Sequence, residues 1–301
     1  MKEENYYNQI KDILIENEVY KKVKDYSKNK HDLESYYNVG KLLIEAQGGE
    51  ARSKYGDGLI KKYSKKLTKD LKIKYDYTSL SRMRQFYLLF KNVAHIAQLS
   101  WSHYQALLPL KNIDKINYYI DQCIKFNLGR DALRERIKQK EYERLPDSTK
   151  SKLITNDKLN INDFVKNPII IKSNNKEVIS EKVLHQLILE NIESFLCELG
   201  EGFSFIGSEY KIKLGNNYNY IDLLLFNIKY NCYVVVELKV TELKKEHIGQ
   251  IETYMNYIDK KLKTIYQDKT IGIIICRVNN QYIIEYSSDR RIISREFQLK
   301  N

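Results

Sequence analysis

The sequence predicts a two-domain protein, in which an all-α domain is followed by an α/β domain with a mixed sheet. Its 301 residues are enough for two domains, each with its own core. Apolar residues at helical spacing fill the first half, whereas runs of β-branched and aromatic residues dominate the second half. The net charge of +12 is uneven, with +10 in residues 1–150 and +2 in residues 151–301. This asymmetry suggests that one domain holds a polyanion while the other carries out chemistry. A general bias of the composition towards surface lysine and asparagine is an alternative explanation of the charge.

Residues 1–150 are expected to form the helical domain, with a role in DNA binding. Apolar residues recur at a period near 3.6 between Tyr6 and Tyr26. Similar patterns predict further helices after Asp32 and after Asp57, from Asp114 to Phe126 and from Asp131 to Tyr142.

One of these helices has the features of a DNA-recognition helix. Thr78 or Ser79 is expected to cap an amphipathic helix that runs to Phe90. A shorter helix and a turn precede it, which is the order of a helix-turn-helix motif. The exposed side chains that would contact DNA from this helix are those of Arg82, Arg84 and Gln85. An ordinary amphipathic helix with surface arginines explains the same pattern, so both interpretations stay open.

Residues 151–180 are predicted to be a linker, and residues 181–301 the α/β domain. The linker region is rich in Asn, Ser, Asp and Lys, and two of the three prolines lie between residues 146 and 180. The expected order after it is a helix from Glu181 to Leu199, several strands, a helix from Leu243 to Tyr257, and strands at Ile271–Cys276 and Tyr282–Tyr286.

The stretch from Tyr220 to Val240 contains the candidate site. Two apolar runs flank a polar break near residues 228–231, which predicts two strands joined by a tight hairpin. Asp222, Glu237 and Lys239 interrupt these runs. Glu237 and Lys239 are two residues apart and so share a face, and the hairpin places Asp222 roughly opposite Glu237.

Two carboxylates side by side in an apolar sheet call for a neutralising cation. A hard divalent ion with oxygen ligands fits this requirement. An edge salt bridge is the structural alternative, because an E-x-K pair alone has little specificity. Its position after the apolar run that begins at Val234 favours the metal site.

These residues resemble the PD-(D/E)xK nuclease signature, with Ile221 in place of the proline. More of the chain resembles the YhcG-type nucleases, which combine a helical, winged-helix-like domain with a PD-(D/E)xK domain. The matching pieces in the first half include Tyr55-Gly56, residues 83–87, residues 99–104 and residues 140–145. Those in the second half include residues 203–207, the two strands of the hairpin and residues 271–276.

The resemblance implies a restriction-endonuclease-like fold and a set of site residues. Asp222, Glu237 and the Leu238 carbonyl would bind Mg2+ or Mn2+, with Glu193 as a helix-borne acid and Lys239 beside the ion. Gln250 and Tyr254 resemble the Q-x-x-x-Y element of a RecB-like branch. His185 stands where the family would carry a glutamate, and Glu181 is a second candidate acid. Apart from the resemblance, Lys211 and Lys213 alternate outward on a strand and are candidates for contacts with a backbone phosphate, with ordinary surface lysines as the alternative.

The resulting functional hypothesis is a metal-dependent DNA endonuclease. The resemblance also makes a role in bacterial defence plausible, with restriction-modification or other defence proteins as partners, and a homodimer is possible. Two alternatives are a non-catalytic nucleic-acid-binding or assembly protein, and a nuclease directed at RNA. His103 is expected to be a core or capping residue, because no acid is spaced to orient it as a base. Four scattered cysteines, no apolar run long enough to span a membrane and no signal-peptide pattern lead us to expect a cytoplasmic protein.

Overall fold

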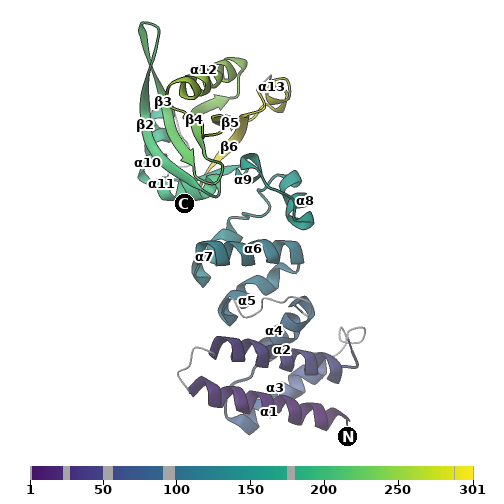
Figure 1. Ribbon diagram of the computed structural model, residues 1–301. Coiled ribbons are helices and arrows are strands. Elements are labelled where there is room, and N and C mark those ends of the chain that lie inside the picture. Colours follow the sequence, from purple (N-terminus) through teal and green to yellow (C-terminus); the bar gives the residue numbers. More distant parts are fainter. Residues whose placement is uncertain are drawn as a thin grey trace. The chain divides into compact units, whose positions relative to one another are not determined.

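The computed structural model describes residues 2–22, 28–49, 57–90, 99–174, 180–287 and 289–300. It divides the chain into two compact units, a helical unit at Met1–Tyr142 and a sheet unit at Glu143–Asn301 (Figure 1). The division falls before the boundary expected near residue 150. The segment 151–180, expected to be a linker, instead contributes elements to the sheet unit. Tyr55-Gly56 lies outside the described residues.

The helical unit is all-α over its described residues, as predicted. Its elements are α1 (Lys2–Lys22), α2 (Lys28–Ala46), α3 (Asp57–Leu71), α4 (Tyr77–Phe90), α5 (Trp101–Leu107), the 3-10 helix η3 (Leu108–Leu110), α6 (Ile113–Phe126) and α7 (Arg130–Lys138). None of the described helices of the whole chain combines the length and the apolar character needed to cross a bilayer.

Helix α4 is held in the core of the helical unit by a close approach to α2. A Cβ atom at Gly40 of α2 would lie 2.1 Å from the backbone oxygen of Met83 in α4. Only glycine therefore permits this crossing. The N-terminus of α4 is capped by Asp76, whose carboxylate accepts a hydrogen bond of 2.7 Å from the Ser79 N–H, and not by Thr78 or Ser79.

The sheet unit is built on six strands in the order β1-β6-β5-β4-β3-β2. The strands β2, β3 and β4 pair antiparallel, whereas β4, β5, β6 and β1 are parallel to one another, so the sheet is mixed as predicted. The strands are β1 (Ile169–Lys172), β2 (Phe203–Leu214), β3 (Asn217–Asn227), β4 (Cys232–Glu242), β5 (Ile271–Val278) and β6 (Ile292–Lys300). The helices are α8 (Asp147–Thr155), α9 (Ile161–Phe164), α10 (Glu181–Glu190), α11 (Ile192–Leu199), α12 (Lys245–Lys261) and α13 (Gln281–Glu285).

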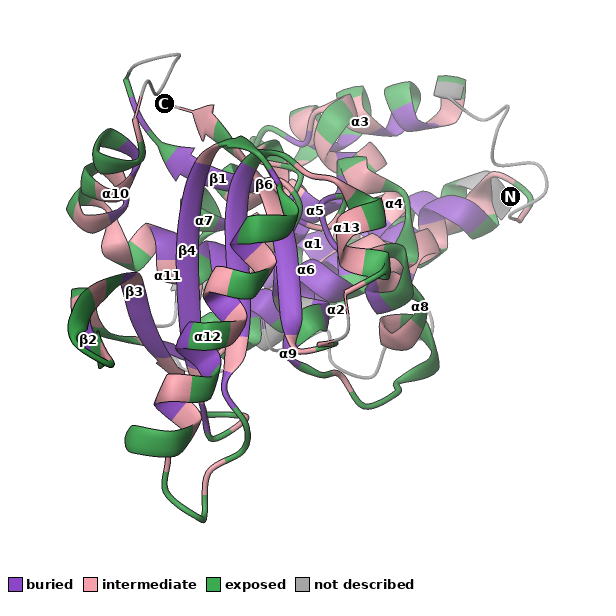
Figure 2. Cartoon of the chain, turned by 90° about the horizontal axis from the view of Figure 1, so that it is seen from above, coloured by how far each residue is buried: buried purple, intermediate pink, exposed green. Residues whose placement is uncertain are grey.

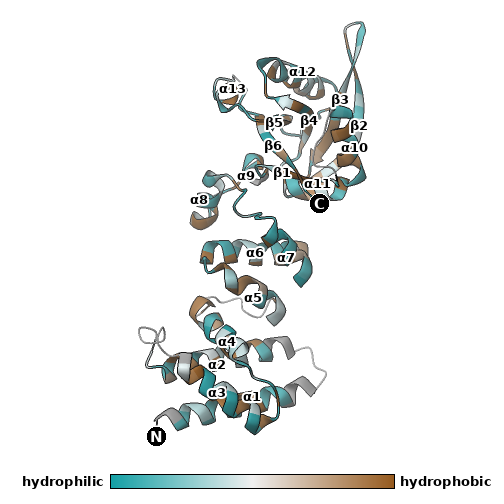
Figure 3. Ribbon diagram, turned by 180° about the vertical axis from the view of Figure 1, so that it is seen from behind, coloured by the Kyte–Doolittle hydropathy of each residue, from teal (hydrophilic) through white to brown (hydrophobic). Residues whose placement is uncertain are grey.

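Helices cover both faces of this sheet, because its central strands are apolar on both sides. Val236 belongs to a core shared with α9, α10 and α11, and its neighbour Val235 belongs to a core shared with α12. Figure 2 shows the central strands buried behind α12, and in Figure 3 apolar residues gather on the strands and on α10 and α11. A run such as Val234–Val236 is therefore continuous and does not alternate with polar residues.

A buried ion pair fixes the beginning of the sheet unit to α11. Arg144 donates from its two Nη atoms to the Glu198 carboxylate, at 2.5 and 3.1 Å. Glu198 also accepts from the Ile170 N–H of β1 at 3.0 Å, and Arg144 donates to the Pro168 carbonyl at 2.8 Å. Burial would raise the pKa of Glu198, but the hydrogen bond from Arg144 and the charge of Lys166 lower it overall.

Three predictions for this unit were wrong. Residues 181–199 form two helices, α10 and α11, and not one. Residues 281–285 form α13, whereas a strand was expected at Tyr282–Tyr286. Ile169–Lys172, expected in the linker, is an edge strand whose partner is β6, with Ile169 paired to Phe297.

Candidate functional site

The site begins where the ladder between β3 and β4 ends. The paired residues run from Asn227 and Cys232 to Leu223 and Val236. One further step in this register sets Asp222 opposite Glu237, as the sequence predicted. At that point the Leu238 N–H donates to the Asp222 Oδ2 atom at 2.8 Å, so a side chain takes the place of a backbone acceptor. The Asp222 carboxylate is thereby held in the gap between the two strands.

Glu237 and Lys239 lie beside this gap on β4, and both are buried. Glu237 is 2% exposed and Lys239 is 8% exposed. The Lys239 Nζ atom lies 3.5 Å from Glu237 Oε2. The other oxygen of Glu237, Oε1, is buried and has no hydrogen-bond partner in the described part of the chain. An unpartnered buried carboxylate oxygen is costly in free energy unless something else binds it.

Helix α10 contributes two more groups to the site. Glu181, in its first turn, places Oε2 3.6 Å from the Lys239 Nζ atom. One turn later, the His185 Nε2–H donates to the backbone oxygen of Asp222 at 3.1 Å. The ring nitrogen must be the donor here, because a carbonyl only accepts. His185 therefore fixes the backbone of Asp222, while Leu238 fixes its side chain.

Helix α12 contributes His247, which is buried in the first turn. Its Nδ1 atom accepts a hydrogen bond from the Lys244 N–H at 3.1 Å. Burial and the nearby charge of Lys239 lower the pKa of His247 below its usual value. Both effects favour the neutral form of the ring.

The surroundings of Asp222 and Glu237 disfavour the charged form of each carboxyl group. Burial raises the pKa of Asp222, against the Leu238 N–H and the charge of Lys239, which lower it. Burial and the charge of Asp222 raise the pKa of Glu237. The charge of Asp222 acts on Glu237 because the register of β3 and β4 sets the two residues opposite each other.

Lys239 keeps its positive charge. Burial alone would lower the pKa of Lys239, but the charges of Glu237, Glu181 and Asp222 together raise it. One ammonium group faces the buried carboxylate of Glu237, the partly buried carboxylate of Asp222 and the half-exposed carboxylate of Glu181. The site therefore carries an excess of negative charge that a bound cation would neutralise.

The donor set fits a hard divalent ion. Asp222 and Glu237 offer carboxylate oxygens, and the unpartnered Oε1 atom of Glu237 is open to a ligand. The Leu238 N–H points to Asp222, and the carbonyl of the same strand residue leaves the backbone on the same side. Among the described residues, no group of three or more His, Cys, Asp or Glu side chains has the geometry of a metal centre. Two carboxylates, one carbonyl and water are the ligands typical of Mg2+ rather than of an ion held in an all-protein cage.

Three other predicted site residues, Gln250, Tyr254 and Glu193, lie on α12 and α11. Tyr254 is buried in the core under α12, and its hydroxyl accepts from the Gln250 amide at 3.2 Å. This pair braces α12; within the described residues, no hydrogen bond or ion pair joins it to Lys239. Glu193 is exposed on α11, while Glu181 is the helix-borne acid beside Lys239.

The predicted DNA readers of α4 differ in their exposure. Arg82 is exposed, whereas Arg84 and Gln85 are partly buried. The Gln85 amide donates to the Leu108 carbonyl at 2.7 Å, so it joins α4 to η3 and does not point outwards. His103 is also occupied, with Ser100 Oγ 2.7 Å from Nδ1 and the Leu128 carbonyl 2.9 Å from Nε2. This agrees with the structural role that the sequence suggested for it.

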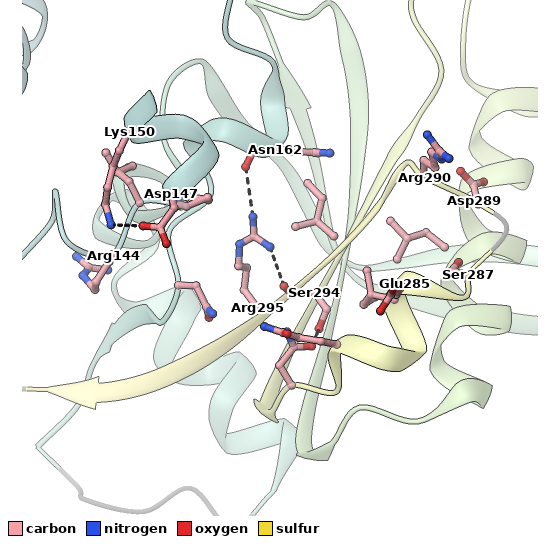
Figure 4. Close-up of a pocket in the computed structure, with 18 of the residues that line it drawn as sticks. Arg144, Asp147, Lys150, Asn162, Glu285, Ser287, Asp289, Arg290, Ser294 and Arg295 are labelled. Carbon is pink, nitrogen blue, oxygen red and sulfur yellow. Dashed lines mark hydrogen bonds and ion pairs between the residues drawn. The ribbon is translucent and has the colours of Figure 1, made fainter. Parts of the chain in front are cut away.

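A polar cavity of about 860 Å³ lies elsewhere in the sheet unit, along β6 (Figure 4). Its lining includes Arg295, which donates to the carbonyls of Val165, Ser294 and Asn162. Burial lowers the pKa of Arg295 to about 10. The residues that line this cavity do not include Asp222, Glu237 or Lys239, so it is separate from the carboxylate site.

The sequence analysis named His185 only as a departure from the family pattern and did not name His247, and only His185 carried a usable signal. His185 follows Glu181 by four residues on a predicted helix, so the two side chains share one helix face. His247 offered no such signal, because its place beside Lys239 depends on how α12 packs against β4.

Comparison with known proteins agrees with this architecture. A family model described as the YhcG PDDEXK nuclease domain matches residues 162–299, and the DUF1016 N-terminal domain matches residues 13–144. The protein named "Putative nuclease YhcG" from Escherichia coli (strain K12) is 26% identical over 283 residues, covering 80% of this chain and 76% of its own length.

Two solved structures also align with the chain. A repair endonuclease from Pyrococcus abyssi is 21% identical over 43% of this chain and 50% of its own, with a TM-score of 0.28. The complex titled EndoMS-dsDNA2 is 20% identical over 43% of this chain and 49% of its own, also with a TM-score of 0.28. The chain thus spans about half the length of these structures, and similarity at this score carries no weight for fold or function.

The two family matches follow each other along the chain in the same order as the helical unit and the sheet unit. The second match contains the whole β3–β4 hairpin with Asp222, Glu237 and Lys239. The chain belongs to the YhcG-type PDDEXK nuclease family, with a DUF1016 N-terminal domain before its nuclease domain.

Proposed function

We propose that this protein is a divalent-metal-dependent DNA endonuclease, with its catalytic centre at Asp222, Glu237 and Lys239. The observation that carries the proposal is the environment of Glu237. It is 2% exposed, it has one unpartnered carboxylate oxygen, and it lies opposite the partly buried carboxylate of Asp222. A purely structural salt bridge would pair these oxygens fully, whereas a metal site leaves one open.

Each residue has a distinct part in phosphodiester hydrolysis. Asp222 and Glu237 would hold Mg2+ or Mn2+, with the Leu238 carbonyl as a further ligand. When bound, such an ion lowers the pKa of a water molecule and neutralises charge on the phosphate. Lys239 keeps its ammonium form, which suits it to orient the attacking water or to stabilise negative charge that develops on the phosphate. His185 and the Leu238 N–H keep Asp222 in position.

The preference for DNA rests on the helical unit. The first half of the chain carries most of the net positive charge, and Arg82 is exposed on α4. A basic domain of this kind binds phosphates without regard to sequence, while the sheet unit performs the chemistry. RNA of the same sequence is the competing substrate that this proposal must exclude.

The proposal is tested by cleavage of labelled DNA and RNA in Mn2+, with four variants. Asp222→Asn, Glu237→Gln and Lys239→Met should each lower DNA cleavage at least about 100-fold, as expected when a group that stabilises the transition state is removed. Glu242→Gln is the matched control, because Glu242 is an exposed residue of the same strand whose carboxylate accepts only from Asn280 among the contacts described.

Metal binding gives a second readout, independent of activity. Calorimetry should detect Mn2+ uptake by the natural protein and by Glu242→Gln, and none by Asp222→Asn. Full activity in the Lys239→Met variant, or metal uptake that survives Asp222→Asn, would refute the assignment of the site.

A further inference from the structure

The strands β2 and β3 extend beyond the rest of the sheet as a two-stranded ribbon. Their paired residues continue to Leu214 and Asn217, whereas the pairing of β3 with β4 stops at Leu223 (Figure 1). The ribbon therefore consists of residues 210–221, and it leads directly to Asp222.

The two faces of this ribbon differ sharply. One face is packed on the core under α12, where Ile212 and Ile221 are 1% and 0% exposed. The opposite face carries two cross-strand pairs, Lys211 with Tyr220 and Lys213 with Tyr218. The two tyrosines are 52% and 56% exposed, and both lysines are exposed. We name these four residues the lysine–tyrosine face.

The lysines and tyrosines of this face act on each other. The Lys211 Nζ atom lies 3.9 Å from the centre of the Tyr218 ring, and the Lys213 Nζ atom lies 6.0 Å from it. Such cation–π contacts hold flexible lysines over the ribbon at modest energies. More than half of the Tyr218 surface stays accessible despite them.

We propose that the lysine–tyrosine face binds the unpaired nucleotides of a substrate strand and leads that strand to Asp222. This proposal rests on the proposed nuclease function, and it names the substrate class as DNA with a single-stranded segment. Lysines would contact successive phosphates, and the tyrosine rings would stack on unpaired bases.

The spacing of the rings favours unpaired nucleotides over a duplex. Tyr218 and Tyr220 are two residues apart on one strand, a rise of about 6.7 Å, and Asp222 follows after the same interval. Stacked bases in a duplex are about 3.4 Å apart, so their neighbours cannot each take one ring. Unstacked bases of a single strand can be splayed onto successive aromatic side chains.

The test measures binding in EDTA, so that neither metal nor cleavage contributes. The probes are a single-stranded dT oligonucleotide, a blunt duplex, and the same duplex with an unpaired tail. The full-length protein is compared with Tyr218→Ala, Tyr220→Ala and their Phe counterparts. Tyr266→Ala is the matched control, since Tyr266 is 84% exposed elsewhere in the sheet unit.

Each alanine variant should weaken binding of the dT oligonucleotide and of the tailed duplex about 5- to 150-fold. Binding of the blunt duplex should stay unchanged, the Phe variants should bind normally, and Tyr266→Ala should behave as the natural protein does. Because all probes share the phosphate contacts of the helical unit, the comparison between tailed and blunt duplexes cancels that contribution.

Equal losses on blunt and tailed duplexes would overturn the proposal and place the ribbon in a duplex groove, where two-stranded ribbons also fit. No loss on any probe would overturn it as well. If the alanine variants lose binding to the tailed duplex but not to the blunt duplex in EDTA, and the natural protein fails to cleave DNA in Mn2+, the catalytic proposal is refuted and this proposal stands.

Discussion

The most informative perturbation is Glu237→Gln, because it is expected to stabilise the metal-free protein. Glu237 is almost fully buried, one of its oxygens has no partner, and its neighbour Asp222 is also a carboxylate. An unsatisfied buried polar or charged group costs about 1–3 kcal/mol. Glutamine keeps the shape of the side chain, removes the charge and still offers an oxygen to Lys239.

The pH dependence of this effect has a defined sign. The pKa of Glu237 is raised in the folded protein, so its penalty is absent below the unfolded value of about 4.3 and grows as the pH rises above it. The stability gap between Glu237→Gln and the natural protein should therefore open between about pH 4 and the folded pKa of about 8.

The assay must report on the sheet unit, because the only tryptophan, Trp101, lies in the helical unit. Hydrogen exchange of peptides from β3 and β4, measured in EDTA at pH 7, meets this need. The variant should exchange more slowly there by the equivalent of about 1–3 kcal/mol. Adding Mn2+ at 100 times its Kd should then stabilise the natural protein by about 2.7 kcal/mol and leave Glu237→Gln unchanged.

The opposite result would refute the reasoning. If Glu237→Gln were less stable than the natural protein in EDTA, Glu237 and Lys239 would form an ordinary structural salt bridge. The same substitution therefore separates the metal site from its structural alternative without any measurement of cleavage.

Three further predictions concern other parts of the chain. Glu198→Gln should destabilise the sheet unit by about 3 kcal/mol at pH 7, because it leaves Arg144 buried without its counter-charge. The folded pKa of Glu198 is lowered, so thermal melts below about pH 4 should show a smaller loss of stability. A loss that stays constant with pH would contradict the ion-pair account. Gly40→Ala should destabilise the helical unit by about 1–3 kcal/mol in denaturant melts followed by tryptophan fluorescence, since its Cβ would collide with the Met83 carbonyl. Helix propensity alone predicts a gain of about 1 kcal/mol, and that result would show that α2 and α4 can separate. Arg82→Ala should weaken DNA binding and reduce the slope of affinity against salt by about 1, and an unchanged slope would remove α4 from the DNA-binding surface.

The parts of the fold that depend on neighbouring residues were predictable from the sequence. The β3–β4 hairpin, its turn and the pairing that sets Asp222 opposite Glu237 follow from local apolar runs and a short polar break. The all-α character of the first half follows in the same way from its helical periodicity.

The parts that depend on distant segments were not predictable. Strand β1 is only four residues long, and its partner β6 lies more than a hundred residues away in the chain, so nothing local marks it as a strand. The ion pair of Glu181 with Lys239 likewise depends on how α10 packs against β4. The position of His247 beside Lys239 likewise arises only when α12 packs on the sheet.

Anomalous diffraction from crystals grown with Mn2+ tests the central claim most directly. The account predicts an anomalous peak between the carboxylates of Asp222 and Glu237, within about 2.5 Å of an oxygen of each, and its loss in Asp222→Asn crystals. Crystals in which no peak appears there and the ammonium group of Lys239 alone bridges the two carboxylates would contradict it.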